Sequence, residues 1–507
     1  MKKIKILSAI LTSALALSFI PVFAGNVSAA SDVAINEKNF PDKVFRKYVK
    51  EKFDTNKDNK LSSKEIAKAE EVVIWYDVDG IVKSLQGVEY LTALEDLQIY
   101  GHNLKKMDLS KNTKLKWLAC QDGLLSELDL SKNTALLTVD VPMNKLTSLN
   151  ISKNVNLVEL NCWENNLTKL DVSKNIQLER LACRSNKLTS LDVTKNIKLD
   201  YLDCSANSIK SLDLTKSLKE LYCYDNNLST LNLSNMGKLK SADWINQAND
   251  FSLLLRVGQK LKGYQEDTFK SQSTDVFDIE KKVTTEDGYE GYILLYNAKK
   301  VGTAVVKNEN NDTIATVKVL YKDVTDPGKF WFEPTYYLSD IGVVKGYDNQ
   351  TKFKPDNECS RAQMVTFLWR LAGSPNPKAK TSDFTDIKSS DYYYKAVIWA
   401  VENGITTGTS KTTFGPDKIC TRAQTVTFLW RMAGKPEPKS TKAKFTDVKT
   451  TDYFFKATLW ASEKKILAGY SDGTFKPKDN CLRRQMVTFL YKYDMYVNEK
   501  GNTGPKI

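Results

Sequence analysis

Three arginines stand at matching places in a segment that is written three times near the C-terminus of this 507-residue chain. Arg361, Arg422 and Arg483 each follow a cysteine by two positions. A hydroxyl residue and a glutamine flank the first two at capping-box spacing, so each arginine is expected in the first turn of a helix. The helix macrodipole disfavours a cation there, while free N–H groups attract an anion. The pattern predicts three small anion sites, the third weakened by Leu482 in place of the capping hydroxyl.

A second set of side chains suited to binding lies mid-chain, where a leucine pattern returns every 21 residues. Residues that flank the central leucine of each expected strand point away from the core. Exposed aromatic and arginine side chains dominate protein interfaces, so these positions predict a ligand face for a protein or a glycan. They are Trp117, Glu159, Trp163, Arg180, Arg184, Tyr201, Tyr222 and Tyr224. A passive solvated surface is the alternative.

A third set consists of oxygen-bearing residues near the N-terminus. The run resembles an EF-hand calcium loop, with Asn59 where that family has glycine. The resemblance implies a single structural Ca²⁺ site. Its ligands would be Asp54, Asn56, Asp58, Lys60 through its carbonyl, Ser62 through water, and Glu65. A metal-free helix-loop-helix cap is the alternative, and nearby lysines weaken the site.

Histidine usage argues against catalysis. His102 is the only histidine, so Ser-His-Asp and Cys-His mechanisms are largely excluded, and its place favours a structural role. Glu159 and Glu164 could imitate the carboxylate pair of a hydrolase, but solvated interface charge explains them better. We expect no enzyme.

The central pattern, L-x-x-L-x-C-x-x-N-x-L, resembles the leucine-rich-repeat family over residues 81–245. Repeats of this kind stack to bury a continuous core. An internal asparagine column should satisfy backbone groups at each turn. Its members are Asn144, Asn165, Asn186, Asn207 and Asn226, with Gly123 breaking the column. Rungs about 4.8 Å apart do not suit disulfides, so the core cysteines should be free thiols.

The C-terminal third resembles S-layer homology domains. The resemblance rests on Gly469 to Pro477, on the Thr-Arg-Ala-Gln segment, and on Trp399 and Trp460 in preceding helices. The family implies a pseudo-threefold helical bundle that grips anionic, often pyruvylated, secondary cell-wall polysaccharide. By position, the three arginines would pair with carboxylate. Pro334 is expected to interrupt the first helix of repeat one.

The whole chain is therefore expected to be multidomain. The order is a secretory signal (1–30), a helical EF-hand-like cap (31–80), leucine-rich repeats (81–245), an immunoglobulin-like β-sandwich spacer (246–322), S-layer homology repeats (323–377, 378–438, 439–497) and a tail (498–507). No other apolar run is long enough for membrane insertion after signal removal.

The expected function is that of an internalin-like surface protein on a Gram-positive type cell wall. Net charge is +13 overall, with 29 Lys/Arg against 20 Asp/Glu from Asp323 onward, which favours anionic surface polymers over nucleic acid. A lysine-rich solvated surface would give the same balance. The main alternative is a purely structural S-layer or envelope component, and a wall-associated hydrolase is a weaker one.

Overall fold

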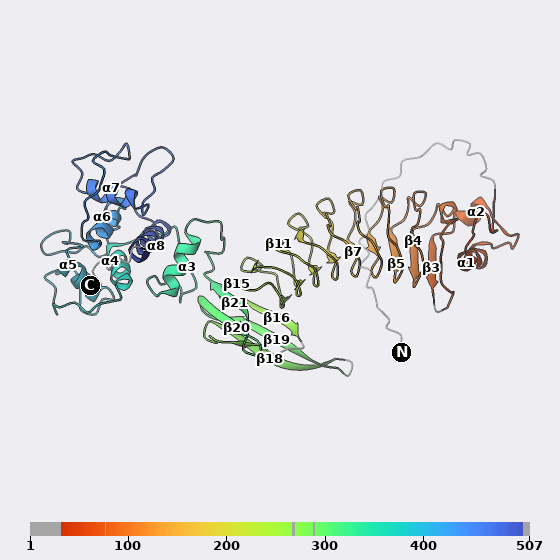
Figure 1. Cartoon of the computed structure of the whole chain (residues 1–507), viewed down its shortest axis with the longest axis horizontal. Coiled ribbons are helices and arrows are strands. Elements are labelled where there is room, and N and C mark those ends of the chain that lie inside the picture. The colour runs from red at the N-terminus through yellow and green to blue at the C-terminus, as the bar shows by residue number, and fades with distance from the viewer. Residues whose placement is uncertain (1–31, 77, 266–268, 287–288, 500–507) are drawn as a thin grey trace.

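The computed structural model describes residues 32–499 apart from 77, 266–268 and 287–288, so the expected signal and most of the tail lie outside it. The described chain is elongated (Figure 1). A curved stack of strands carries two helices at its N-terminal end, a β-rich segment follows, and a helical bundle forms the other end.

The N-terminal cap packs a helix-loop-helix against the first rung of the solenoid. Its elements are β1 (Val33–Ala34), α1 (Lys43–Phe53), β2 (Lys60–Leu61) and α2 (Ser63–Ile66). The side chain of Asp42 caps α1 by accepting the N–H groups of Val44 and Phe45. Phe45 and Val49 are fully buried, so α1 covers leucines that the end of the stack would otherwise expose.

The solenoid is built on one parallel sheet. Its strands are β3 (Glu71–Trp75), β4 (Asp96–Tyr100), β5 (Trp117–Gln121), β6 (Thr138–Asp140), β7 (Glu159–Asn161), β8 (Arg180–Ala182), β10 (Tyr201–Asp203), β12 (Glu220–Tyr222) and β14 (Ser241–Asp243). A turn, η1 (Val88–Tyr90), follows β3, while β9 (Ser190–Asp192), β11 (Ser211–Asp213) and β13 (Thr230–Asn232) lie outside this sheet. The repeat sets the register, pairing Leu160 with Leu181 and Leu181 with Leu202. The sheet starts at β3, inside the range expected for the cap.

The predicted asparagine column is present. Asn144 donates through Nδ2 to the carbonyl of Cys120 at 2.8 Å, and its Oδ1 accepts the N–H of Leu125 at 3.0 Å. Later members repeat these bonds one rung further on. A second column was not predicted: each member donates to two carbonyls of the preceding turn, and the column consists of Asn112, Asn133, Asn154, Asn175 and Asn196.

His102 completes the first column where Gly123 breaks it. Its ring occupies the space of the missing side chain, 2.0 Å from where a Cβ on Gly123 would lie. Nδ1 accepts the N–H of Leu104 at 3.1 Å, the bond that an asparagine at 123 would make. Burial lowers the pKa of His102 to about 4, so the ring is neutral beside Cys120, whose Sγ lies 2.9 Å from Nε2. The single histidine is structural.

The core cysteines are free thiols, as predicted. Cys120, Cys162, Cys183, Cys204 and Cys223 are all buried and unbridged. Burial raises the pKa of each of these thiols, which therefore pack as small apolar side chains.

The β-rich segment extends the solenoid. Its strands are β15 (Ser252–Arg256), β16 (Lys260–Gln265), β17 (Lys270–Ser271), β18 (Phe277–Glu286), β19 (Tyr289–Ala298), β20 (Gly302–Lys307) and β21 (Thr313–Leu320). β16 pairs with β14, continuing the main sheet through β19 to β18, while β15 pairs with β13 in a five-stranded sheet. One hydrophobic core runs from Ile35 through Trp244 to Val319. The expected separate spacer therefore shares its core with the repeats.

A second core lies in the C-terminal bundle. Its helices are α3 (Phe332–Asp340), α4 (Arg361–Leu371), α5 (Tyr394–Glu402), α6 (Arg422–Met432), α7 (Phe455–Glu463) and α8 (Arg483–Glu499). Backbone hydrogen bonds close a ring through it: Cys359 N–H to the Cys481 carbonyl, Cys420 to Cys359, and Cys481 to Cys420, at 2.9, 2.9 and 2.8 Å. The expectation for Pro334 is wrong: it sits in the first turn of α3, where its missing N–H costs no helical bond.

Candidate functional site

The three predicted arginines begin the three equivalent helices. α4 starts at Arg361, α6 at Arg422 and α8 at Arg483. Capping boxes precede the first two, formed by Ser360 with Gln363 and by Thr421 with Gln424 as predicted. An arginine in a first helical turn is expected to project outward, but these three side chains are buried. The residues are 4%, 3% and 1% exposed in chain order.

Aromatic rings from the neighbouring repeat sandwich each guanidinium. The Arg361 Cζ lies 4.9 Å from the ring centre of Phe414, and that of Arg422 lies 4.9 Å from both Tyr470 and Phe475. Arg483 closes the cycle over Tyr347 and Phe353 of repeat one, at 4.7 and 4.4 Å. Each site is therefore shared by two repeats. Cation–π contact with these rings takes the place of the hydration that an exposed guanidinium would have.

Each arginine also holds the hairpin of that neighbouring repeat. Arg361 Nε donates to the carbonyl of Phe414 at 3.0 Å, while the N–H of Phe414 donates to Asp386 at 2.8 Å. The other two sites repeat this arrangement, with Arg422, Phe475 and Asp447, and with Arg483, Phe353 and Asp323. The nearby aspartates are thus occupied by backbone N–H groups.

These guanidinium groups make no ion pair. Within the residues that the structure describes, arginine ion pairs are formed by Arg46, Arg180, Arg184 and Arg484. Burial lowers the pKa of Arg361, Arg422 and Arg483 from its usual value. A buried cation without a carboxylate partner is costly, so each position is electrostatically suited to an incoming anion.

The two predicted tryptophans are not at the surface. Trp399 and Trp460 are each 1% exposed, packed in the helical core beside alanines of their own helices. Their large apolar rings fill the space between α5 or α7 and the bundle centre. Both tryptophans therefore belong to the core of the bundle, and their contact with a glycan stays a prediction.

Another aromatic set was missed. Phe330, Tyr392 and Tyr453 stand two residues before α3, α5 and α7 and are 60%, 62% and 63% exposed. Each meets the following ring edge-on, for example Tyr453 with Phe454 at 5.1 Å. Three consecutive aromatic residues end at the first residue of each of these helices, a repeated signal that the sequence does contain.

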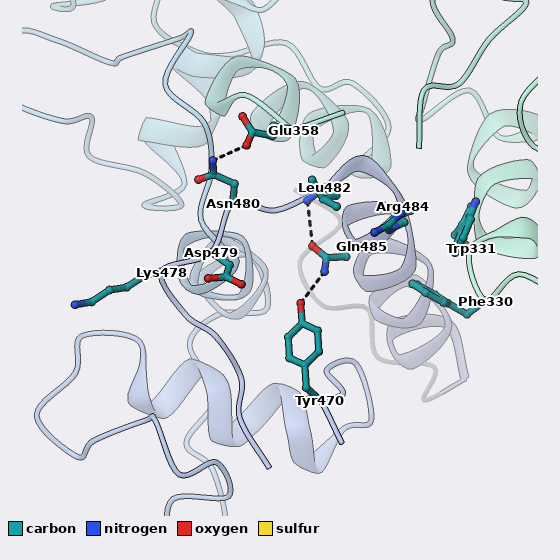
Figure 2. A pocket seen from close by; sticks show the side chains of 10 residues that line it. All are labelled: Phe330, Trp331, Glu358, Tyr470, Lys478, Asp479, Asn480, Leu482, Arg484 and Gln485. Carbon is teal, nitrogen blue, oxygen red and sulfur yellow. Dashed lines mark hydrogen bonds between the residues drawn. The ribbon is translucent and has the colours of Figure 1, made fainter. Parts of the chain in front are cut away.

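Figure 2 shows an open groove of about 830 Å³. Arg422 does not line it, but Tyr470, whose ring centre lies 4.9 Å from the Arg422 Cζ, does. Tyr470 and the backbone segment up to Leu482 form one wall, and Phe330 with Trp331 faces them from repeat one. Gln485 bridges the wall, accepting the N–H of Leu482 and donating to the Tyr470 hydroxyl. Segments far apart in sequence therefore build one groove.

The concave sheet face brings most of its predicted residues together. Arg180 lies 4.1 Å from the ring centre of Tyr201 and 3.8 Å from Glu159, with Nε as its nearest nitrogen. Arg184 lies 4.6 Å from the ring centre of Trp163, one rung back. Its carboxylate partner is Glu164, at 4.0 Å. A hollow of about 310 Å³ is lined by Glu159, Trp163, Arg180, Arg184 and Tyr201.

The other predicted face residues flank that hollow. Tyr222 follows Tyr201 on the next rung, with ring centres 5.7 Å apart, and Tyr224 is the second residue beyond it. Trp117 stands two rungs before Glu159 and is partly buried. The predicted face is thus one continuous strip along the sheet.

The acidic loop of the cap is tightly hydrogen bonded. Asp54 accepts the N–H groups of Asp58 and Asn59 at 3.0 Å each, and Asn59 has the predicted left-handed backbone, with a φ of 63°. Glu65 is turned to Thr55 and Ser62, whose N–H and hydroxyl groups lower its pKa to about 2. In the described residues no three acidic, histidine or cysteine side chains gather as a metal site.

Comparison with known proteins identifies the bundle. Residues 320–365, 383–426 and 444–487 match the S-layer homology domain family. The chain carries three S-layer homology domains. A stretch of 129 residues is 32% identical to an endoglucanase of Bacillus sp. (strain KSM-635), covering 25% of this chain and 13% of that enzyme. A stretch of 128 residues is 32% identical to the surface-layer 125 kDa protein of Lysinibacillus sphaericus, covering 25% and 10%.

Among solved structures, the functional domain of InlJ from Listeria monocytogenes, which includes a cysteine ladder, aligns with 58% of this chain and 99% of its own length. The identity is 18% and the TM-score 0.30. The chain spans about a tenth of the two curated relatives. Its leucine-rich solenoid and S-layer homology domains make it a bacterial cell-surface protein. No helix in the described part of the chain could cross a bilayer.

Proposed function

We propose that the three S-layer homology domains form a pseudo-threefold anchor for an anionic, pyruvylated wall polysaccharide, and that the concave solenoid face is displayed to bind an extracellular protein or glycan. The proposal makes the chain a non-catalytic adhesion module. The observation that carries it is the three buried guanidinium groups without a carboxylate partner.

A carboxylate on a sugar matches these positions. The guanidinium plane is already fixed by the rings and by the Nε bond to the hairpin carbonyl, so little side-chain entropy is lost when an anion binds. The exposed rings of Phe330, Tyr392 and Tyr453 offer apolar faces to a pyranose beside each groove.

Repetition within one chain strengthens such an anchor. Three weak sites on one bundle bind a polymer together, because the second and third contacts occur at high effective concentration. The ring of cysteine backbone bonds supports a fixed mutual arrangement of the three grooves.

Arg422→Gln tests the anchor, with Arg431→Gln as its matched control. Both arginines lie on α6 and donate to a backbone carbonyl, but Arg431 is in the last turn, away from the ring pair. We expect Arg422→Gln to weaken sedimentation of the full chain with isolated cell walls by roughly tenfold.

The control should sediment like the parent, and thermal unfolding should show that both variants are folded at the temperature of the wall-binding assay. Equal wall binding by a folded Arg422→Gln would overturn the anchor mechanism. Loss of wall binding with no partner for the solenoid would favour a purely structural envelope role.

A second proposal concerns the cap loop as a weak structural calcium site. The oxygen donor set suits a hard cation, with Asp54, Asn56 and Asp58 holding it, but Glu65 would have to exchange its present hydrogen bonds. Calcium should raise the melting temperature of the full chain but not of Asp58→Ala. An unchanged melting temperature of the parent in calcium would reject the site.

A further inference from the structure

The concave sheet has a charge opposite to that of the chain. None of the strands β3–β14 contains lysine, and Arg180 is their single arginine. The main-sheet strands nevertheless carry an acid on nearly every rung. Those that are exposed or half-buried are Glu71, Asp96, Asp140, Glu159, Asp203 and Glu220, whereas Asp243 is buried and does not belong to the strip. A chain of net charge +13 thus presents an acidic strip on one face.

Lysines of the same repeats lie elsewhere. One exposed lysine precedes each member of the second asparagine column, in the turn that leads into the next sheet strand. They are Lys111, Lys132, Lys153, Lys174 and Lys195. Because the repeat holds each position on its own side of the stack, the sheet strands carry acids without lysine, whereas the turn side carries lysines together with acids such as Asp171 and Asp192.

Most of the acidic strip is not neutralised internally. Among the described residues 71–243, the ion-paired acids are Glu95, Glu127, Glu159, Glu164 and Asp200, of which only Glu159 belongs to the strip. Arg180 and Arg184 each have a glutamate beside them. Their positive charge is therefore already balanced.

Two oxygen atoms in the middle of the strip have no hydrogen-bond donor among the described residues, although the Nε2 of Gln121 donates to Oδ2 of Asp140. Asp140 and Asn161 are register partners on β6 and β7. The Oδ1 atoms of both are inaccessible to water, and within the described residues neither has a donor. Burial raises the pKa of Asp140 to about 6, and it also raises the pKa of Asp96 and of Asp203. A partner that brings positive charge would offset the acids of this region.

Aromatic rings alternate with the acids. Trp75 is exposed and stacks on Tyr100 at 3.9 Å, and Tyr201 meets Tyr222 further along the strip. Aromatic faces and carboxylates together recognise lysine and arginine side chains, through cation–π contact and charge-assisted hydrogen bonds. An anionic wall polymer would be repelled from this face.

We infer that the concave sheet binds a lysine- or arginine-rich polypeptide segment of another protein. The inference rests on the display role proposed above and names the chemistry of the displayed partner. It assigns opposite charges to the two binding regions, so that wall polymer and partner do not compete for one surface.

The test uses the full chain and a fluorescent peptide of alternating lysine and glycine, at low ionic strength. The variant is Asp140→Asn with Asp203→Asn. The matched control is Asp171→Asn with Asp192→Asn, which removes the same charge off the main sheet and keeps an acceptor for the N–H groups of Ser173 and Thr194. We expect the variant to bind the peptide roughly tenfold more weakly than the parent and the control to bind like the parent.

Equal weakening by both double variants would overturn the inference, because net charge alone would then explain binding. Preferential binding of a glutamate–glycine peptide or of maltoheptaose, run in parallel, would also overturn it. Both double variants should still sediment with cell walls like the parent. Wall binding and peptide binding can therefore fail separately.

Discussion

Arginines stack on aromatic rings both in the solenoid and in the bundle, but their charge is handled differently. On the concave face, Arg180 and Arg184 are partly exposed, and each has a glutamate within 4.0 Å. In the bundle, Arg361, Arg422 and Arg483 are buried between rings and bond to backbone carbonyls instead. Stacking alone therefore does not mark an anion site, whereas burial without a counter-charge does.

The comparison also separates cost from gain. Exposed ion pairs contribute about 0–1 kcal/mol each, so the solenoid pairs can be rearranged by a partner at little cost. A buried unpaired cation is retained at a cost to the fold, and a ligand's anion offsets that cost on binding. By the same reasoning, the carboxylate of Asp140 on the acidic strip is retained at a cost to the fold, and a cation of the partner offsets that cost on binding.

The largest expected effect concerns the three buried arginines of the bundle and their contribution to wall binding. Replacing Arg361, Arg422 and Arg483 together by glutamine should reduce the wall affinity of the full chain by about 10²–10⁴-fold. All three sites are then lost, and with them the gain in affinity that comes from binding one polymer at several sites. Sedimentation isotherms with isolated walls measure it. Arg180→Gln with Arg184→Gln, removing stacked arginines of the other kind, should leave wall affinity unchanged. Comparable losses in both variants would erase the distinction between the two regions.

A smaller effect concerns Asp140, the buried anion. Its pKa in the folded state is about 6, above the ordinary aspartate value. The fold thus favours the protonated form, and the carboxylate lowers stability above pH 6. That cost disappears as pH falls from about 6 to about 4. Asp140→Asn should raise the free energy of unfolding by about 2 kcal/mol at pH 7.5 and by little at pH 4.

Urea unfolding of the solenoid at the two pH values provides the measurement. Asp171→Asn is the control of opposite sign, because hydrogen bonds from Ser173 lower the pKa of Asp171 and its carboxylate therefore favours the fold at neutral pH. If both substitutions stabilise alike, loss of general charge repulsion is the better explanation.

The repeat period explains why so much of the fold was predictable. A 21-residue spacing fixes which leucines meet on adjacent rungs, and the position of Asn144 in that spacing fixes its carbonyl partners. Capping boxes likewise located the starts of α4 and α6. These features depend on near neighbours in the sequence or on strict periodicity.

What could not be predicted depends on contacts between distant segments. A first-turn arginine can extend to solvent or fold against another repeat, and only the position of Phe414 relative to α4 decides. The sequence around Trp399 does not indicate whether this side chain is exposed or buried, and only the fold decides that it is buried. The union of β16 with β14 required a pairing across the expected domain boundary. The compensation of Gly123 by His102 joins neighbouring rungs and breaks the strict repeat.

The smallest expected effect tests the solenoid side of the comparison. Arg184→Gln should lower the free energy of unfolding by less than about 1 kcal/mol, because the guanidinium loses only a partly exposed ring contact and a long ion pair with Glu164. The loss should shrink further in high salt, where Glu164 is screened. Urea unfolding at low and high salt measures both. A large, salt-independent loss would mean that more than a partly exposed ring contact and a long ion pair holds Arg184, and the contrast between the two regions would no longer hold.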